Sequence, residues 1–255
     1  MKCSNCLKDV LFAETHYNHK QHRWNCIPNN LGIDKTNSSA LKVLDICSGM
    51  GGFSQSFLER GHDVLRIDNN PKFKDVPNTV IADVRDIRSI VQEVIPDIVL
   101  ISPPCECFSV ASQYIHWSKE GNPVDSQTLT MIRVVFWCLD AVDYLKPKYW
   151  VMENPRGRLR HLIGMPAVET TFGAWGALQV KPTDIWGNIP PGMVWPYLGQ
   201  FYDKPLVGAG CGMNGKDMRS SKSSERALIP PSMSLAICLA MEKLTLLTPK
   251  VEIKQ

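Results

Sequence analysis

The feature that most constrains this chain is a regular alternation of short apolar runs and amphipathic stretches between residues 41 and 152. Such alternation predicts strands that alternate with helices, and therefore a mainly parallel sheet covered on both faces. The runs that predict strands are 41–46, 63–67, 79–82, 97–101 and 149–152, and the stretches that predict helices are 53–60, 87–94, 126–145 and 232–247. We therefore expect an α/β fold built on a doubly wound, largely parallel, Rossmann-like sheet.

The composition excludes several other classes of protein. The 255 residues suit one sizeable α/β domain with a small appendage, and 44% hydrophobic with 21% charged residues exclude a mostly disordered chain. We expect no membrane span, because no apolar run approaches the roughly 18 residues that one needs. We expect no signal peptide, because residues 1–10 are polar. The net charge of +3 is compatible with a polyanionic partner without requiring one.

The nine cysteines form an odd set, which argues against a secreted disulfide scaffold. The sequence therefore predicts a soluble protein of a reducing, cytoplasmic compartment, in which some cysteines bind metal or take part in chemistry.

A glycine-rich turn follows the first predicted strand, over residues 45–53, and opens a helix. Glycines there let backbone amides approach a ligand closely at the positive end of a helix. Asp68 ends the second strand 19 residues after Gly49, a distance at which an acid can accept hydrogen bonds from ribose hydroxyls. Asp83, after the third strand, could reach an adenine amino group. The alternative is an ordinary strand–helix turn with surface acids.

Cys105 follows the fourth strand in the segment Ser-Pro-Pro-Cys, at the sheet edge where ligands and catalytic groups gather. The prolines stiffen this turn, so Cys105 is a candidate thiolate nucleophile, whereas Cys107 is expected to point elsewhere. Glu153 ends the fifth strand and would face Cys105, with a pKa raised by partial burial. The alternatives are a small buried cysteine and a salt-bridged strand-end acid.

These loops resemble the cytosine-C5 DNA methyltransferase family over roughly residues 41–188 and 225–242. The glycine turn is similar to the family's methyl-donor motif, Pro104-Cys105 to its catalytic motif, and Glu153-Asn154 to its Glu-Asn motif. A looser likeness covers residues 179–183, and Pro230-Pro231 resembles the motif that closes the donor pocket. Small phage-type and prokaryotic members are the most similar, which implies a prokaryotic or phage-infected host cytoplasm.

The resemblance implies transfer of a methyl group from S-adenosylmethionine to carbon 5 of a cytosine that is flipped out of DNA. It implies that Cys105 adds covalently to carbon 6, that Glu153 binds and protonates the base, and that Lys181 helps to position it. The implied donor contacts are Asp45, Cys47, Gly49, Gly51, Gly52, Asp68, Asn69, Asp83, Val84 and Pro103.

The chain departs from the family pattern at several positions. Cys47 stands where relatives place an aromatic residue against the adenine, and Lys181 and Thr183 replace two arginines. The target-recognition region, near 188–226, is short. We therefore expect low sequence specificity, or specificity supplied elsewhere.

Residues 1–30 hold a second cluster of interest. Cys3 and Cys6, followed by His22 and Cys26, have the spacing of a structural zinc site, with the second pair one helical turn apart. His16 and His19 compete for the histidine position. The alternative is a polar arm with incidental cysteines. A zinc-finger-like module here could add phosphate contacts.

The sequence thus predicts three parts: a zinc-binding module over 1–30, a linker over 31–40, and a methyltransferase domain over 41–255. The expected activity is cytosine-C5 methylation of DNA. The same chemistry on RNA, and a catalytically silent nucleic-acid-binding module, stay open. An enzyme that methylates amino groups is disfavoured, because Cys105 stands where such enzymes carry an aromatic residue.

Overall fold

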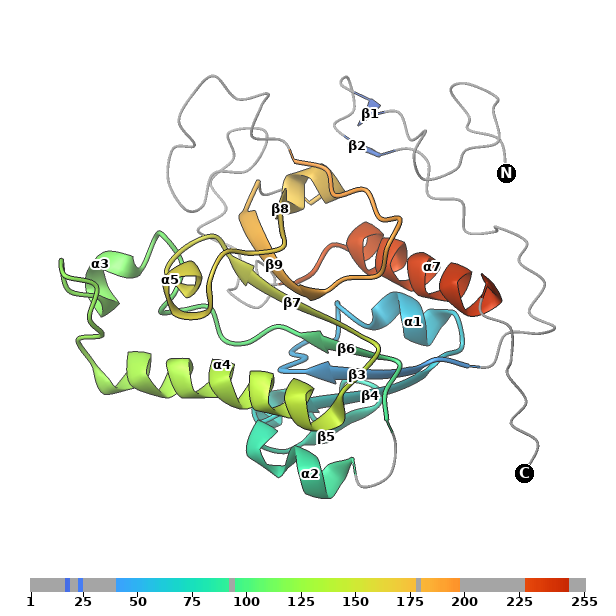
Figure 1. Cartoon of the computed structure of the whole chain (residues 1–255), viewed down its shortest axis with the longest axis horizontal. Coiled ribbons are helices and arrows are strands. Elements are labelled where there is room, and N and C mark those ends of the chain that lie inside the picture. Colours follow the sequence, from blue (N-terminus) through green and yellow to red (C-terminus); the bar gives the residue numbers. More distant parts are fainter. Residues whose placement is uncertain are drawn as a thin grey trace.

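A computed structural model describes residues 17–18, 23–24, 40–91, 95–177, 180–197 and 228–247 of the chain (Figure 1). Its centre is a seven-stranded sheet with the order β5-β4-β3-β6-β7-β9-β8. Five strands are parallel and carry the first part of the sheet: β3 (Lys42–Ile46), β4 (Asp63–Asp68), β5 (Thr79–Ile81), β6 (Ile98–Ile101) and β7 (Tyr149–Pro155). Two antiparallel strands complete it: β8 (Val168–Thr171) and β9 (Pro182–Asn188). The predicted α/β fold with a largely parallel sheet is confirmed.

The sheet lies between two helical layers because both of its faces are apolar. In β6, Ile98 and Leu100 enter one hydrophobic cluster, and Val99 and Ile101 enter the other. Each face of such a strand must be covered, which explains why its sequence is continuously apolar. Helices α1 (Gln55–Glu59) and α7 (Pro231–Leu247) cover one face, and α2 (Ile87–Ile90) and α4 (Ser126–Leu145) cover the other (Figure 1).

Helix α4 has the predicted bounds because its ends carry strong local signals. The Asp125 side chain accepts a hydrogen bond from the Thr128 backbone N–H and caps the helix. Lys146 then adopts a left-handed conformation, with φ of 47°, and Pro147 follows it. Proline cannot continue a helix, so the end of α4 is encoded locally.

Other elements differ from their predictions. Helix α1 is shorter than 53–60, and α2 ends at Ile90 rather than at residue 94; residues 92–94 lie outside the described part of the chain. Strand β7 continues to Pro155, three residues past its predicted end, because β9 pairs with it over that stretch. Strands β8 and β9 and the short helices α3 (Gln113–His116) and α5 (Leu159–Ile163) were not predicted.

Helix α7 is attached to the end of α1 and to the loop before β4 by a charged contact. Glu242 accepts hydrogen bonds from Arg60 at 2.7 and 2.6 Å, and lies 3.1 Å from His62 Nε2. The Leu41 N–H donates a hydrogen bond to His62 Nδ1, so the ring proton is on Nε2. That N–H donates a hydrogen bond to Glu242. This contact fixes α7 over the sheet, and with it the segment that leads into α7.

The N-terminal part contributes two described pieces, β1 (Tyr17–Asn18) and β2 (Arg23–Trp24), which pair antiparallel. The predicted helical turn between His22 and Cys26 is therefore wrong at Arg23 and Trp24, because these residues pair as a strand. Cys3, Cys6, His22 and Cys26 themselves lie outside the described residues, so the zinc site stays a prediction.

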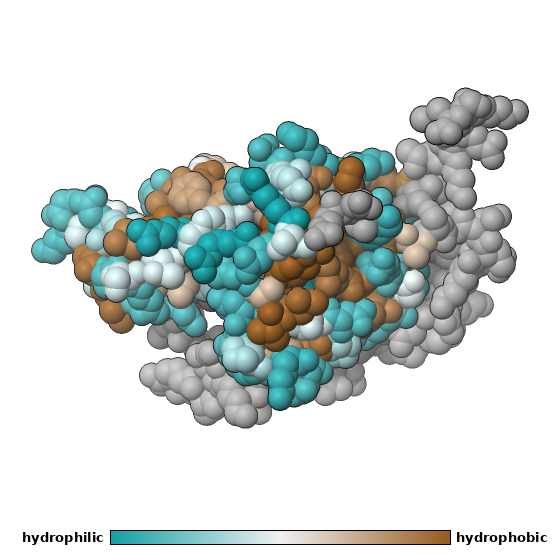
Figure 2. All heavy atoms as spheres, turned by 90° about the horizontal axis from the view of Figure 1, so that it is seen from below, coloured by the Kyte–Doolittle hydropathy of each residue, from teal (hydrophilic) through white to brown (hydrophobic). Residues whose placement is uncertain are grey.

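One face of the molecule mixes hydrophilic with hydrophobic residues (Figure 2). Within the described ranges, we find no helix with the length and apolar character that crossing a membrane requires.

Candidate active site

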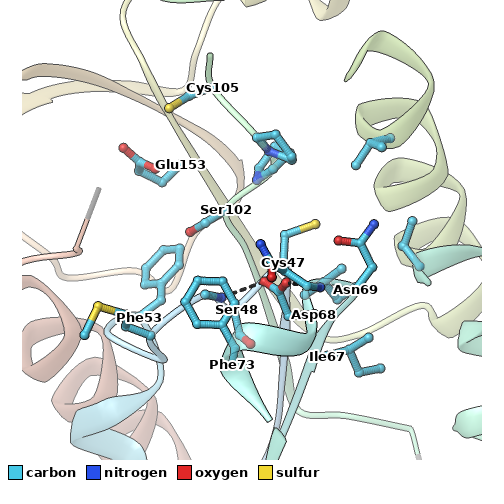
Figure 3. Close-up of a pocket in the computed structure, with 18 of the residues that line it drawn as sticks. Cys47, Ser48, Phe53, Ile67, Asp68, Asn69, Phe73, Ser102, Cys105 and Glu153 are labelled. Carbon is cyan, nitrogen blue, oxygen red and sulfur yellow. Dashed lines mark hydrogen bonds between the residues drawn. The ribbon is translucent and has the colours of Figure 1, made fainter. Parts of the chain in front are cut away.

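A cavity of about 340 Å³ opens where β3, β4, β6 and β7 end, at the edge of the sheet predicted to hold the site (Figure 3). Eleven of the thirteen predicted catalytic and donor-contact residues line this cavity. Those that line it are Cys47, Gly49, Gly52, Asp68, Asn69, Asp83, Val84, Pro103, Cys105, Glu153 and Lys181. The fold therefore brings residues from six separate segments to one pocket.

The glycine turn after β3 holds the Asp68 carboxylate in place. Gly49 has a φ of +52°, which a residue with a side chain rarely adopts. Its N–H donates to Asp68 Oδ2 at 2.8 Å, and the Asn70 N–H donates to Oδ1 at 2.9 Å. Both carboxylate oxygens are thus oriented, and each keeps accepting capacity for a ligand hydroxyl.

Two other predicted donor contacts, Asp45 and Gly51, do not line the cavity. Asp45 is fully buried and accepts a hydrogen bond from Ser54 at 2.6 Å. Burial raises the pKa of Asp45 to about 6, against the opposing effects of Ser54 and the Arg66 charge. The Gly51 carbonyl accepts from Arg66 at 3.0 Å. Asp45 is therefore tied to the start of α1, and Gly51 is held within the turn by Arg66.

Arg66 is the centre of this support, and sequence analysis missed it. Its side chain is fully buried and also donates to Ser54, Gln55 and the Pro77 carbonyl. A Cβ at Gly51 would lie 2.5 Å from the guanidinium carbon, so glycine is required there. A lone charged residue within a predicted apolar strand was the signal that could have revealed it.

The apolar end of the cavity lies between β4, the segment after β5, and α4. Its walls share one hydrophobic cluster and include Cys47, Ile67, Ala82, Val84, Met131 and Val134. Cys47 has a φ of 56° and its Sγ lies 4.0 Å from Cys138 Sγ. This sulfur contact, together with burial, raises the pKa of Cys47, so its thiol stays neutral and acts as an apolar wall.

Asp83 lines the same end but is already engaged. Its carboxylate caps η3 (Val84–Asp86) through the Arg85 N–H and forms an ion pair with the Arg85 side chain at 2.9 Å. These hydrogen bonds lower the pKa of Asp83, so it remains a charged acceptor beside the apolar walls.

Cys105 and Glu153 approach one another at the opposite end of the cavity, where their side chains point to the same side of the strands (Figure 3). Glu153 is 4% exposed, and burial raises the pKa of its carboxyl, as predicted. Burial also raises the pKa of the Cys105 thiol, while the charge of Lys181 opposes that rise.

Lys181 joins this pair from the loop before β9. Its Nζ lies 3.3 Å from Glu153 Oε1 and 4.0 Å from the centre of the Phe172 ring. The residue has a φ of 33°, a backbone conformation that costs free energy in a residue other than glycine. The surrounding contacts therefore hold a cation where it stabilises the anionic forms of both Glu153 and Cys105.

Asn154 sets the distance between the two strand-end loops. Its Nδ2 donates to the Pro103 carbonyl at 3.0 Å, which connects β7 to the turn that carries Cys105.

Cys107 is fully buried outside the cavity, and its carbonyl accepts from the Trp117 ring N–H at 2.6 Å. The expectation that Cys107 points elsewhere is confirmed.

The segment before α7 closes the pocket over the glycine turn. Leu228 and Ile229 line the cavity, and a Cβ at Gly52 would lie 2.6 Å from a Leu228 methyl group. Gly52 is therefore needed because the two segments lie in direct contact.

Several cavity residues escaped sequence analysis. They are Ser48, Phe73, Ser102, Thr130, Met131 and Val134. Ser48 and Ser102 adjoin predicted motifs, and their hydroxyl groups were the missed signal. The α4 residues Thr130, Met131 and Val134 carried no such signal in the sequence, because helical spacing does not indicate which ligand a helix will face.

A second cluster of metal-binding residue types, His62, Cys238 and Glu242, lies where the loop between α1 and β4 meets α7. Glu242 already binds Arg60, and His62 Nε2 carries the proton that it donates to Glu242. A metal would have to displace both contacts, so these residues fit a structural role better than a metal site.

The pocket fits a nucleoside-bearing ligand. It combines apolar walls, an oriented acid and a turn of close backbone approach. Next to it lie a candidate nucleophile, Cys105, and a buried acid, Glu153, an arrangement typical of α/β enzymes whose sites lie at the sheet edge.

Comparison with known proteins shows which proteins part of this chain resembles. Residues 41–165 match the C-5 cytosine-specific DNA methylase family. "Putative type II methyltransferase M.MJ0563P" of Methanocaldococcus jannaschii is 30% identical, over 45% of this chain and 41% of that protein. M.AplI of Arthrospira platensis is 27% identical over 53% and 37%, and M.HgiGI of Herpetosiphon aurantiacus is 26% identical over 47% and 94%. Both are type II methyltransferases.

Residues 41–165 of this chain are thus similar to the C-5 cytosine-specific DNA methylase family. The chain spans 41% and 37% of the first two relatives' lengths, so the match concerns this domain rather than those whole proteins.

Proposed function

We propose that this chain is a methyltransferase that acts on carbon 5 of cytosine in DNA, with Cys105 as nucleophile and Glu153 as proton donor. The observation that carries the proposal is the shared pocket. Cys105 and Glu153 line one end of the pocket, where Lys181 contacts Glu153. The glycine turn and Asp68 line the opposite end.

The need for a nucleophile follows from the base. Carbon 5 of cytosine reacts poorly with electrophiles until a group adds at carbon 6 and makes carbon 5 electron-rich. The Cys105 thiolate supplies that group: a C–S bond forms, and the ring's electrons move towards nitrogen 3. When the carbon-5 proton is later removed, the ring regains its double bond and Cys105 leaves as thiolate.

Glu153 supplies the proton for this step. Because burial raises the pKa of its carboxyl, the acid form persists to a higher pH than in a free glutamate and can protonate nitrogen 3 as Cys105 adds. Lys181 offsets the cost of the thiolate, whose pKa burial raises. Neither group can reach a base within a stacked duplex, so the target must be flipped out, at a cost of a few kcal/mol.

S-adenosylmethionine, when bound, supplies an electrophilic methyl group. Asp68 would hold its ribose hydroxyls, and the walls formed by Ile67, Val84 and Met131 would hold its adenine. Gly49 would allow the backbone to approach it closely. Asn69, Gly52 and Pro103 complete the proposed contacts, and Cys47 provides a wall in place of an aromatic ring.

We further propose the domain organisation predicted above, with a zinc module at 1–30, a linker at 31–40 and the methyltransferase domain from 41. Cys3, Cys6, Cys26 and one histidine would bind zinc, with His22 favoured over His16 and His19. The zinc module would add phosphate contacts to the short target-recognition region near 188–226.

A trapping experiment tests the covalent step. Fluorine at carbon 5 cannot leave as a cation, so DNA containing 5-fluorocytosine should remain attached to the protein when the methyl donor is present. The adduct should survive denaturing electrophoresis. Cys105→Ala should abolish it, and Cys107→Ala, which changes a buried cysteine outside the cavity, is the matched control.

The outcomes separate the other activities. Trapping on RNA and not on DNA would show that RNA is the substrate, while the proposed covalent mechanism would stand. Donor binding without trapping on either polymer would favour a silent binding module. Bisulfite sequencing of DNA from cells that express the chain would identify the target context.

A further inference from the structure

Ser102 lies where the donor part of the pocket meets the catalytic part. It is the first residue after β6, and its N–H donates to the Ile46 carbonyl at the end of β3, at 3.1 Å. It thereby adjoins the glycine turn on one side and, through Pro103 and Pro104, Cys105 on the other. Its backbone position is fixed by the sheet.

The Ser102 hydroxyl has no hydrogen-bond partner among the described residues, although its oxygen is buried. It points into the space between Glu153 and Phe53 (Figure 3). The hydroxyl of Ser48, in the glycine turn, is likewise buried and unpartnered, and Ser48 lines the same cavity at 8% exposure. A buried polar group without a partner costs about 1–3 kcal/mol, so a pocket with two such hydroxyls indicates a polar ligand group.

The order of contacts along the pocket identifies that group, given the proposed donor. Asp68 marks the ribose and Cys105 marks the reacting end, so the sulfur and its amino-acid chain must lie between them, beside Ser102. The amino-acid chain ends in a carboxylate, which needs donors. The lysines lining the cavity are engaged elsewhere: Lys181 with Glu153 and Phe172, and Lys72 over the Phe73 ring at 4.6 Å.

We propose that the hydroxyls of Ser102 and Ser48 donate hydrogen bonds to the carboxylate of the methyl donor's amino-acid end. The inference rests on the proposed function, since it assumes that S-adenosylmethionine is the ligand. It assigns Ser102 a binding role that fixes the donor's sulfur relative to Cys105.

Calorimetric titration of the full chain without DNA tests this with two ligands, S-adenosylmethionine and its decarboxylated form. Ser102→Ala should weaken binding of S-adenosylmethionine by roughly 10-fold or more, the scale of a lost hydrogen bond to a charged group. It should leave binding of the decarboxylated form unchanged within about 2-fold, because that ligand has no carboxylate to lose. Ser48→Ala should give the same selectivity.

The free protein provides a second readout. Because the hydroxyl is unpartnered without ligand, Ser102→Ala should leave the thermal unfolding midpoint unchanged or raise it. Ser89→Ala, at an exposed serine on α2, is the matched control for both measurements. Equal losses for both ligands, or no loss for either, would overturn the assignment to the carboxylate. If the unsubstituted chain bound neither ligand, the proposed function itself would fail.

Discussion

The ammonium of Lys181 lies 3.3 Å from Oε1 of Glu153, and 28 residues separate them in the chain. This cation opposes burial at two neighbouring acids, because it lowers the pKa of both Glu153 and Cys105. The pair therefore couples the proposed proton donor, Glu153, to the proposed nucleophile, Cys105.

Lys181→Met should shift the pH profile of 5-fluorocytosine trapping to higher pH. Without the cation, the pKa of the Cys105 thiol rises, so the thiolate forms at higher pH. The pKa of Glu153 rises as well, so its acid form persists to higher pH. The fall of trapping on the alkaline side of the profile therefore moves to higher pH too. Lys181→Arg, which keeps the charge, should retain most of the original profile. A profile that does not move in the methionine variant would remove Lys181 from the catalytic step.

Asp68→Ala should weaken S-adenosylmethionine binding by roughly 1–3 kcal/mol, the scale of lost hydrogen bonds to a charged group. The substitution also frees the N–H groups of Gly49 and Asn70, which the carboxylate now orients. Asp63→Ala, at the exposed start of the same strand, is the control for titration calorimetry. Equal affinity in the Asp68 variant would move the ribose contact to another residue.

Glu242→Gln should make the free energy of unfolding less dependent on pH in the acid range. Burial disfavours the Glu242 carboxylate, but His62 and Arg60 lower its pKa from 4.5 to about 2. A lowered folded-state pKa adds stability that is present above about pH 4.5 and lost as the pH falls towards 2.

The substitution should therefore cost on the order of 2 kcal/mol at pH 7, allowing for solvent screening, and much less near pH 2. Urea unfolding across this range measures the difference. Glu59→Gln, at an exposed glutamate that contacts Gln55, should leave the pH dependence unchanged.

Metal analysis of the purified chain should find about one zinc ion per molecule, the stoichiometry of a closed four-ligand site. Cys6→Ser should lower the zinc content and make DNA binding less dependent on salt, because phosphate contacts of the zinc module are lost. Cys238→Ala should retain the metal. Loss of zinc in that variant instead would place the ion at His62 and Glu242.

The parallel half of the fold could be predicted because its signals are local. Apolar runs mark β3, β4 and β6, and the start and end of α4 are encoded by Asp125 and Pro147. Strand β9 could not be predicted in the same way. It forms by pairing with β7, in which Ile185 lies opposite Glu153. The residues around β9 in the sequence do not indicate that its partner strand lies 32 positions away.

The sequence by itself determined the residue types and their order: a glycine turn, an acid after the second strand, Cys105 after the fourth and Glu153 at the end of the fifth. Parallel strands end at one edge of a sheet, which is why these motifs could be expected to meet. Only the tertiary structure decided that Asp45 is buried and accepts from Ser54, that the Gly51 carbonyl accepts from Arg66, and that Lys181 contacts Glu153. The physical reason is that burial, hydrogen-bond direction and strand register depend on neighbours distant in sequence, and spacing along the chain does not record them.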